Sequence, residues 1–399
     1  MPNLFKRRHT SQGRHTPNLR SIWLVAPLAL IAVGLLAFAL YQGADALLTS
    51  ENMTKTPVDV QDVIKTTVTV ITLMGAVLAG VYAYRKQLLA EGDSHRADAS
   101  QLAERYGTAA EQLGHEQAAV RLAGAYALAR LADDWPEQRQ MCVDVLCAYL
   151  RMPYEANATS PGFRMGEREV RRTIVELIRN HLQDPSAPTT WCGLDLDFTS
   201  ATFDSGADFR GAQFTGGNVS FQRVRLTGAG VSFGDARFAG STVSFMDTKF
   251  TDGGVSFIGA EFTGGVVSFY GSEFSGSTVI FSSSTFSGGR VSFQLADFCG
   301  SEIIFGTVRI SGGLVLFDGA KFNSGTVQFG GTRVMSGGFS FGHAEFAGSA
   351  VFFTHAQFRG GEVGFADATL TGGTVSFEDA SVGADAFISW GPFTPISST

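Results

Sequence analysis

Phenylalanine recurs every twelve residues through the second half of this chain, in fourteen successive units. The series is Phe221, Phe233, Phe245, Phe257, Phe269, Phe281, Phe293, Phe305, Phe317, Phe329, Phe341, Phe353, Phe365 and Phe377. A second apolar position, usually Val, lies two residues before each of these, and a third, usually Phe, lies five residues after. A small residue, often Ala, stands two residues before the third position. A fixed period of this kind predicts a repeat architecture with the apolar positions facing inward.

Several units contain a five-residue motif: a small residue, a polar residue, Phe or Leu, a small or polar residue, and Gly. It occurs as AEFTG at 260–264, AEFAG at 344–348 and AQFRG at 356–360, and more loosely as VSFIG at 255–259. In these residues the chain resembles the pentapeptide-repeat proteins, over about 194–382. It departs from their pattern because the spacing alternates between five and seven. Only the first repeats, from Phe198 to Phe214, approach a spacing of five throughout.

The resemblance implies a right-handed quadrilateral parallel β-helix with one pentapeptide on each side. Two twelve-residue units would then form one coil of about 24 residues, with the Phe stack inside and Gly at turns where a Cβ would be costly. Fourteen units would give seven coils, roughly 34 Å long at about 4.8 Å for each strand. A two-sided coil of twelve residues is the alternative.

Two uncharged stretches near the N-terminus, Ile22–Tyr41 and Thr66–Tyr84, are long enough to cross a bilayer as helices. Lys and Arg are concentrated before the first stretch and directly after the second, whereas the loop between them is more acidic. This asymmetry predicts a multi-pass membrane protein with both termini in the cytoplasm. Together with the resemblance to the pentapeptide-repeat proteins, it leads us to expect the bacterial inner membrane. The alternative for the first stretch is a cleaved signal peptide, which would still leave everything after residue 86 in the cytoplasm.

Between the predicted membrane spans and the repeats, apolar residues recur with the period of an α-helix. Helices are predicted at 105–113, 117–132, 138–150 and 168–182, with a loop at 152–166. Two consecutive helices of this kind resemble a single HEAT-like pair, which cannot bury its apolar face alone. We therefore expect this collar to cap one end of the solenoid. A partner-binding helical module is the alternative.

The predicted fold is a membrane-anchored α region followed by an all-β solenoid. Its parts are a basic cytoplasmic tail (1–21), a transmembrane hairpin (22–86, with spans at 22–41 and 66–84), a helical linker or capping module (87–190), the pentapeptide-repeat-like β-helix (191–385), and a C-terminal cap and tail (386–399). We expect the apolar cluster FISW at 387–390 to cap the last coil. Its alternative role is to join two rods.

Charge is mild over the whole chain, with 30 Lys and Arg against 37 Asp and Glu. From Cys192 onward there are 18 acidic and 10 basic residues, a net charge of −8. The four cysteines are scattered without metal-type spacing, which is typical of thiols in a reducing compartment.

The residue directly before the third apolar position of each unit is expected to face outward. We call this series the outward ladder, and its charged members include both basic and acidic residues. It runs Arg225, Arg237, Lys249, Glu261, Glu273, Thr285, Asp297, Arg309, Lys321, Arg333, Glu345, Gln357, Thr369 and Ser381. If two repeat units close one coil, Lys249 and Glu273 are neighbours of opposite charge, as are Asp297 and Lys321, with small pairwise gains.

Candidate chemistry is sparse. The Gly pairs follow the repeat and lack the Lys-Ser/Thr of a phosphate-binding loop, and no nucleophile elbow occurs. His343 and His355 could share a metal ion only in a twelve-residue coil. The carboxylates of Glu261, Glu273 and Asp297 are predicted to be exposed ladder positions. We therefore assign no catalytic, cofactor-binding or metal-binding residue and expect no cofactor.

The predicted function is that of a non-catalytic scaffold or protein-interaction platform held at the membrane. Its predicted partners are the lipid bilayer, through two spans, and a protein, but no nucleic acid. The resemblance offers an alternative, because some pentapeptide-repeat proteins mimic DNA, bind gyrase and protect it from quinolones. Those proteins carry a strongly acidic face, which the mixed ladder here does not match. The sequence leaves the partner's identity and the oligomeric state open.

Overall fold

The structure is a computed structural model of the 399-residue chain. It describes residues 60–226, 228, 230–251 and 253–394, together with seven helical residues between Ile31 and Gln42. The predicted basic tail lies outside the described residues, as does most of the first predicted span, 22–41. The chain divides into two compact units, Met1–Gln101 and Leu102–Thr399.

A single helix, α2 (Val60–Leu113), runs for 54 residues. Within the described residues, its segment Val68–Gln87 is the one stretch long and apolar enough to cross a membrane, with a mean hydropathy of 1.5. It overlaps the second predicted span. The prediction of a separate helix at 105–113 is wrong, because this segment is the last part of α2. No proline lies between the apolar segment and Leu113, and the change to charged composition does not end the helix.

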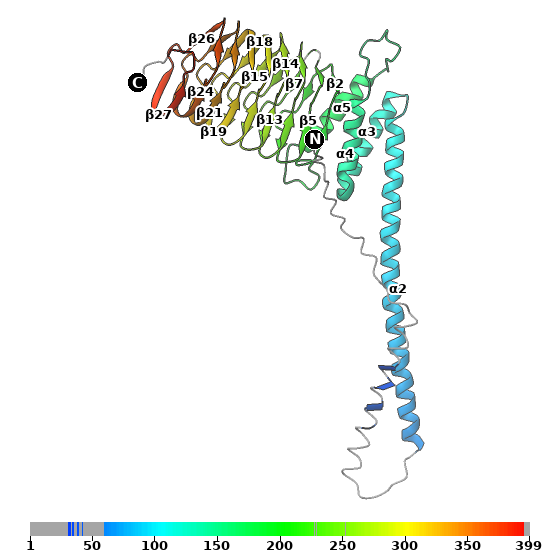
Figure 1. Ribbon diagram of the computed structural model, residues 1–399. Coiled ribbons are helices and arrows are strands. Elements are labelled where there is room, and N and C mark those ends of the chain that lie inside the picture. The colour runs from blue at the N-terminus through cyan, green and yellow to red at the C-terminus, as the bar shows by residue number, and fades with distance from the viewer. Residues whose placement is uncertain are drawn as a thin grey trace, which may run out of the picture. The chain divides into compact units, whose positions relative to one another are not determined.

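Three further helices and one turn of 3₁₀-helix form the collar. They are α3 (Ala118–Asp134), η1 (Pro136–Gln138), α4 (Arg139–Arg151) and α5 (Glu167–His181). These bounds confirm the three remaining predicted helices to within two residues. Helix α4 lies against the first strand of the solenoid and α5 against the third (Figure 1). The collar therefore covers the end of the solenoid where the chain enters it.

The solenoid is built from two parallel sheets. Sheet A has thirteen strands, which are β1 (Leu196–Asp197), β4 (Gln213–Phe214), β5 (Asn218–Ser220), β8 (Arg237–Phe238), β9 (Thr242–Ser244), β12 (Glu261–Phe262), β13 (Val266–Ser268), β16 (Thr285–Phe286), β17 (Arg290–Ser292), β19 (Arg309–Leu316), β21 (Arg333–Ser340), β24 (Gln357–Gly364) and β27 (Ser381–Ser389).

Sheet B has fourteen strands. They are β2 (Thr202–Phe203), β3 (Ala207–Asp208), β6 (Arg225–Leu226), β7 (Val231–Ser232), β10 (Lys249–Phe250), β11 (Val255–Ser256), β14 (Glu273–Ser275), β15 (Thr278–Ile280), β18 (Asp297–Ile304), β20 (Lys321–Gln328), β22 (Glu345–Phe346), β23 (Ala350–Phe352), β25 (Thr369–Leu370) and β26 (Thr374–Ser376).

Strand pairing fixes the length of a coil. Cα partners in neighbouring coils are separated by a 24-residue step, as in Phe250 with Phe274 and Glu261 with Thr285. This register confirms the predicted 24-residue coil, and the twelve-residue alternative is wrong. About eight coils are stacked, one more than predicted. The first step, from Leu196 to Val219, is one residue shorter, because the early repeats are spaced nearer to five.

Stacked phenylalanines fill the interior. Members of the twelve-residue series stack on their counterparts in the next coil, so that Phe269 lies 4.8 Å from Phe293 between ring centroids. The Phe residues at the third apolar position stack in the same way, with 4.6 Å between Phe250 and Phe274. Each buried Phe contributes about 1.5–3 kcal/mol through removal of apolar surface from water. The columns of rings therefore supply most of the apolar stabilisation of the solenoid.

The small position of the repeat is buried against backbone. Where it holds Ser or Thr in place of Ala, the hydroxyl can donate to the carbonyl of a Phe in the preceding coil. Thr248 Oγ1 lies 3.1 Å from Phe221 O, and Ser272 Oγ lies 2.8 Å from Phe245 O. The buried hydroxyl is thereby satisfied. This position accepts either a methyl group or a hydroxyl without loss of the fold.

Aromatic side chains close the C-terminal end of the solenoid. Trp390 packs edge-on against Phe377 at 5.1 Å, and Phe393 against Phe365 at 4.9 Å. Phe387, within the predicted cap, is instead 63% exposed. The cap of the last coil is therefore formed by Trp390 and Phe393.

Candidate functional site

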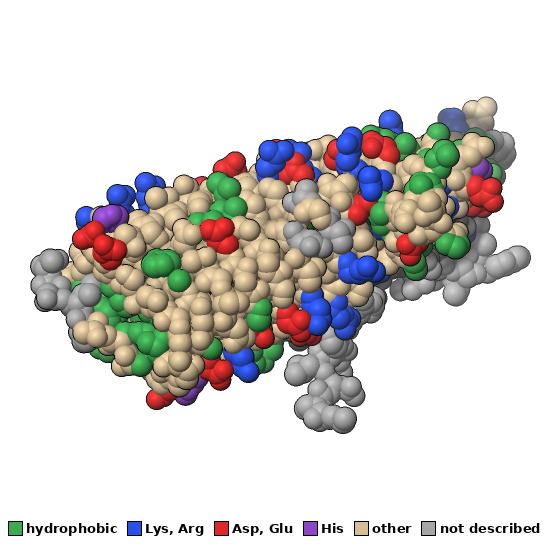
Figure 2. Space-filling view, turned by 90° about the horizontal axis from the view of Figure 1, so that it is seen from above, with side chains coloured by type: hydrophobic (Ala, Val, Ile, Leu, Met, Phe, Trp, Pro, Cys, Tyr) green, Lys and Arg blue, Asp and Glu red, His purple; other side chains and the backbone are tan. Residues whose placement is uncertain are grey.

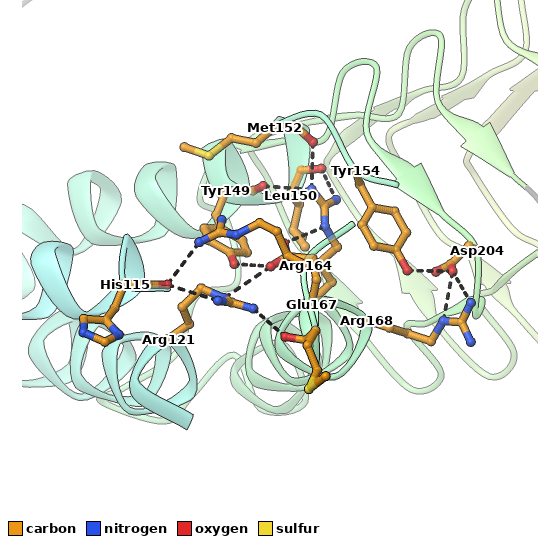
Figure 3. A network of polar contacts seen from close by, with 12 residues as sticks. His115, Arg121, Tyr149, Leu150, Met152, Tyr154, Arg164, Glu167, Arg168 and Asp204 are labelled. Atoms are coloured by element: carbon orange, nitrogen blue, oxygen red, sulfur yellow. Dashed lines mark hydrogen bonds and ion pairs between the residues drawn. The ribbon is translucent and has the colours of Figure 1, made fainter. Parts of the chain in front are cut away.

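A buried ionic network holds the collar together (Figure 3). Glu167, at the start of α5, accepts a hydrogen bond from Tyr149 Oη at 2.7 Å and one from Arg171 Nε at 3.1 Å. The oxygen that accepts from Tyr149, Oε2, also lies 3.3 Å from Nε of Arg121, a side chain with no exposed surface. The two arginines donate in addition to backbone carbonyls, among them Met165 O and Leu150 O. The network thus joins α3, α4 and α5 to the loop after α4.

Tyr149 remains a neutral phenol at physiological pH in this environment. Burial, followed by the hydrogen bond to Glu167, raises the pKa of Tyr149 above its ordinary value. Both oxygens of the Glu167 carboxylate already have partners, Oε1 on α5 itself and Oε2 on α3 and α4, so this group is occupied by structural contacts. We assign it a role in stability.

A second polar cluster connects the collar to the first coil. Tyr154 Oη and Arg168 Nη2 each lie 2.8 Å from Oδ2 of Asp204, which follows β2 (Figure 3). The ring of Tyr154 also packs under the guanidinium of Arg171, with 4.6 Å from Cζ to the ring centroid. The loop after α4 and the start of α5 are therefore attached to the solenoid through one carboxylate.

The two histidines considered as metal ligands lie in different turns of the coil. His343 is in a turn from sheet A to sheet B, and His355 is in a turn from sheet B to sheet A. Both have positive φ, 57° in each case, and His is among the residues enriched in that conformation. Their Nδ1 atoms face carboxylates one coil later, at 4.0 Å from Asp367 and 3.7 Å from Asp379. The coil therefore separates the two side chains.

The outward ladder is paired along the solenoid axis. Lys249 Nζ lies 2.7 Å from Glu273 Oε2, which confirms the predicted pair. Asp297 and Lys321 are Cα partners as predicted, although the carboxylate of Asp297 accepts a hydrogen bond from Asn323 at 2.6 Å. Within the described part of the chain, no group of three or more His, Cys, Asp and Glu side chains is arranged to hold a metal ion.

A hollow of about 320 Å³ lies on the outer face of sheet A. Its floor consists of glycines, including Gly265, Gly288 and Gly312, and its walls include Val266, Arg290 and Leu314. The glycines are required by the backbone, because a Cβ on Gly312 would lie 2.5 Å from Ser287 O in the coil before it. The hollow therefore follows from the Gly-Gly corners, while the repeat leaves the residues along its walls variable.

Four arginines lie on successive coils of sheet A, and the first of them, Arg290, lines this hollow. We call them the arginine face: Arg290 on β17, Arg309 on β19, Arg333 on β21 and Arg359 on β24. Sequence reasoning missed this face because it applied the 24-residue step along the outward ladder only to neighbours of opposite charge. Alternate members of that series belong to opposite sheets, so sorting them by a 24-residue step would have placed Arg309 beside Arg333.

Charged side chains are unevenly distributed on the surface. Figure 2 shows one face of the molecule on which charged groups gather mainly along the margins, while backbone and small polar side chains occupy much of the middle. On this face, charged groups are therefore localised. No protein-family model matches this chain, and neither does any curated protein or solved structure at a significant level.

Proposed function

We propose that this chain is a non-catalytic protein-interaction platform of the pentapeptide-repeat type, anchored in a membrane by its N-terminal region. The observation that carries the proposal is the difference between the inward and the outward positions of each coil. The inward positions are predominantly Phe, Val and Ala, whereas the outward positions are exposed and differ from coil to coil. A repeat protein of this kind offers an extended surface on a rigid core, which is how solenoids bind their partners.

Assignment to the pentapeptide-repeat type is supported by the parallel 24-residue coil and its stacked Phe columns. The extra residues that distinguish this chain lie at corners within each sheet. In later coils the two strands on either side of the corner merge, as in β19 and β21. The departure from a spacing of five is therefore accommodated by a corner and does not disturb the inward positions.

Membrane attachment is supported by the apolar segment Val68–Gln87, of which none is buried within the protein. Arg85 and Lys86 at its end favour a cytoplasmic location for the chain that follows. We propose two spans with both termini in the cytoplasm of a bacterial cell. Carbonate extraction tests attachment: the full chain should stay in the membrane pellet. A C-terminal reporter that fluoresces only after cytoplasmic folding should fluoresce, and a dark reporter would contradict the topology.

The non-catalytic assignment is supported by how the outward ionisable groups are used. Lys249 and Glu273 pair with each other along the ladder, and His343 and His355 serve as turn residues beside carboxylates. The buried carboxylate of Glu167 is held by two arginines and a tyrosine. Each of these groups thus has a structural use that requires no substrate.

Proximity labelling in cells tests the platform itself. A labelling enzyme is fused to the C-terminus of the full chain, and the control carries the same enzyme after residues 1–101. The full chain should enrich a reproducible set of proteins that the anchor-only control does not. Indistinguishable profiles would refute the proposed function.

A further inference from the structure

The arginine face is electrically unlike the rest of the solenoid. The strands that carry it, β17, β19, β21 and β24, contain these four arginines and one acidic residue, Glu362. From Cys192 to the end of the chain, acidic residues outnumber basic ones by 18 to 10. These four strands therefore hold four of the ten basic side chains and one of the 18 acidic ones. It is a basic strip on an acidic rod.

Two arginines of this face lie on adjacent strands in an arrangement that does not stabilise the fold. Arg309 and Arg333 are Cα partners on neighbouring coils, and both are exposed. Like charges directly opposite each other in a sheet are destabilising. Within the described part of the chain, neither they nor Arg290 form an ion pair, whereas Arg237 on the same sheet has Glu261 at 3.9 Å. An anionic group bound between them would relieve the repulsion.

Apolar surface accompanies the charge. The hollow beside Arg290 has Val266 and Leu314 on its walls, and Leu314 is 37% exposed. Met335, one coil further on, is 53% exposed. Arg and Met are enriched in protein–protein interfaces, and a pocket that receives an apolar anchor typically supplies much of the binding energy. The face thus combines sites for carboxylates with a place for one apolar side chain.

Acidic turns border the face along one side and at its far end. The turns that follow its strands include Asp318 and Asp367, and the turn into the next strand of the sheet, β27, carries Glu378 and Asp379, with no Lys or Arg among the described turn residues there. A bilayer or a nucleic acid strand extends beyond the face, and these carboxylates repel its phosphates over roughly 8 Å at physiological salt. A short peptide segment can remain on the basic strip.

We infer that the arginine face docks an acidic segment of a partner protein that carries an apolar side chain. Carboxylates of this segment contact Arg309 and Arg333, and its apolar side chain enters the hollow between Val266 and Leu314. The inference rests on the proposed platform function and names the chemistry of the partner and the face it uses.

Fluorescence anisotropy with a defined probe tests the inference. The probe is a short fluorescein-labelled polyglutamate peptide with one central phenylalanine, titrated with the full chain in non-ionic detergent. We expect saturable binding that weakens with salt. The variant carrying Arg309→Glu and Arg333→Glu should bind roughly tenfold more weakly or worse, because reversing contact charges creates repulsion. A peptide with serine in place of phenylalanine should also bind more weakly to the unchanged chain.

A matched control separates the face from overall charge. Arg225→Glu with Lys321→Glu makes the same change in net charge at equivalent ladder positions on sheet B and should leave the affinity within about twofold, since both positions lie away from the hollow. Equal losses in the two double variants, or no loss in either, would overturn the inference. Stronger binding to single-stranded DNA than to the peptide would also overturn it.

Proximity labelling distinguishes failure of this inference from failure of the platform. If the full chain enriches partners and the Arg309→Glu, Arg333→Glu variant enriches the same set, the platform stands and the arginine face is not its docking surface. Loss of specific partners from that variant alone supports the inference.

Discussion

Phe281 stacks on Phe305, its counterpart in the next coil, with ring centroids 4.7 Å apart and ring planes within 1° of parallel. Both rings are completely buried. The pair is one step in a column that continues in both directions, to Phe257 and to Phe329. The stacking of the core therefore depends on the 24-residue register, because a ring can stack only if its coil is in register with the next.

Removal of one ring should weaken the column at its middle. Phe281→Ala leaves a cavity between two stacked neighbours, and we expect the free energy of unfolding to fall by about 3–5 kcal/mol. Denaturant unfolding followed by circular dichroism measures the loss. Tyr270→Ala, at a 41% exposed turn position, serves as the control and should have a much smaller effect. Equal effects of the two changes would contradict the assignment of the stack as the core.

A Cβ at a corner glycine should be costly. Gly265 has a φ of +71°, and a Cβ there would lie 2.3 Å from Ser241 O of the preceding coil. We expect Gly265→Ala to destabilise the protein by about 1–3 kcal/mol through strained backbone. Gly234→Ala is the matched control, since its nearest atom would be 3.5 Å away. Thermal unfolding of the two variants compares them, and a neutral Gly265→Ala would show that the corner can relax.

Neutralising Glu167 should destabilise the collar. Glu167→Gln keeps the shape of the side chain but leaves Arg121 and Arg171 buried without a counter-charge. Breaking a buried pair in this way costs about 3–5 kcal/mol. Glu169→Gln, two residues further along α5 with a side chain 55% exposed, should change the stability by less than about 0.5 kcal/mol. Denaturant unfolding of both variants, followed by the helical signal in circular dichroism, measures the difference. Similar unfolding midpoints for the two variants would argue against a stabilising role of the network.

Alkaline pH should weaken the collar through two buried thiols. Burial raises the pKa of Cys142 to about 11, and burial together with the Asp144 carboxylate raises the pKa of Cys147 to about 12. Because an unfolded thiol titrates at about pH 8.5, the stability contributed by each is fully present below that pH and is lost as pH rises toward the folded value.

The free energy of unfolding should therefore fall above about pH 9, by about 1.4 kcal/mol per pH unit for each thiol. Denaturant titrations at several pH values measure this slope. Replacing Cys142 and Cys147 by alanine should flatten it even though the absolute stability changes. An unchanged slope in the double variant would assign the alkaline loss to other groups, such as the Tyr149 phenol, whose pKa is also raised by burial.

Helix bounds in the collar and the inward positions of the repeat could be predicted from sequence, since both depend on local periodicity. The span of α2 could not, because nothing in the local sequence shows that the apolar stretch near Val68 and the later turn at Arg105 belong to one helix. The Glu167 network was also missed. Its members come from three helices, and their contacts depend on how those helices pack.

The sequence by itself determined that the second half forms a solenoid with the repeated Phe in its core, because a twelve-residue Phe period with Gly at the corners permits few ways to bury the rings. The strand register in the structure decided between a coil of 24 residues and one of twelve. Only the tertiary structure decided which outward residues gather. Closing each coil over two repeat units sends alternate units to opposite sheets and places each residue beside its counterpart two units later. That step turns a ladder of mixed sign into Arg309 stacked against Arg333 on one face. It also places Arg290, from a different position of the repeat, on the same sheet, where it lines the hollow.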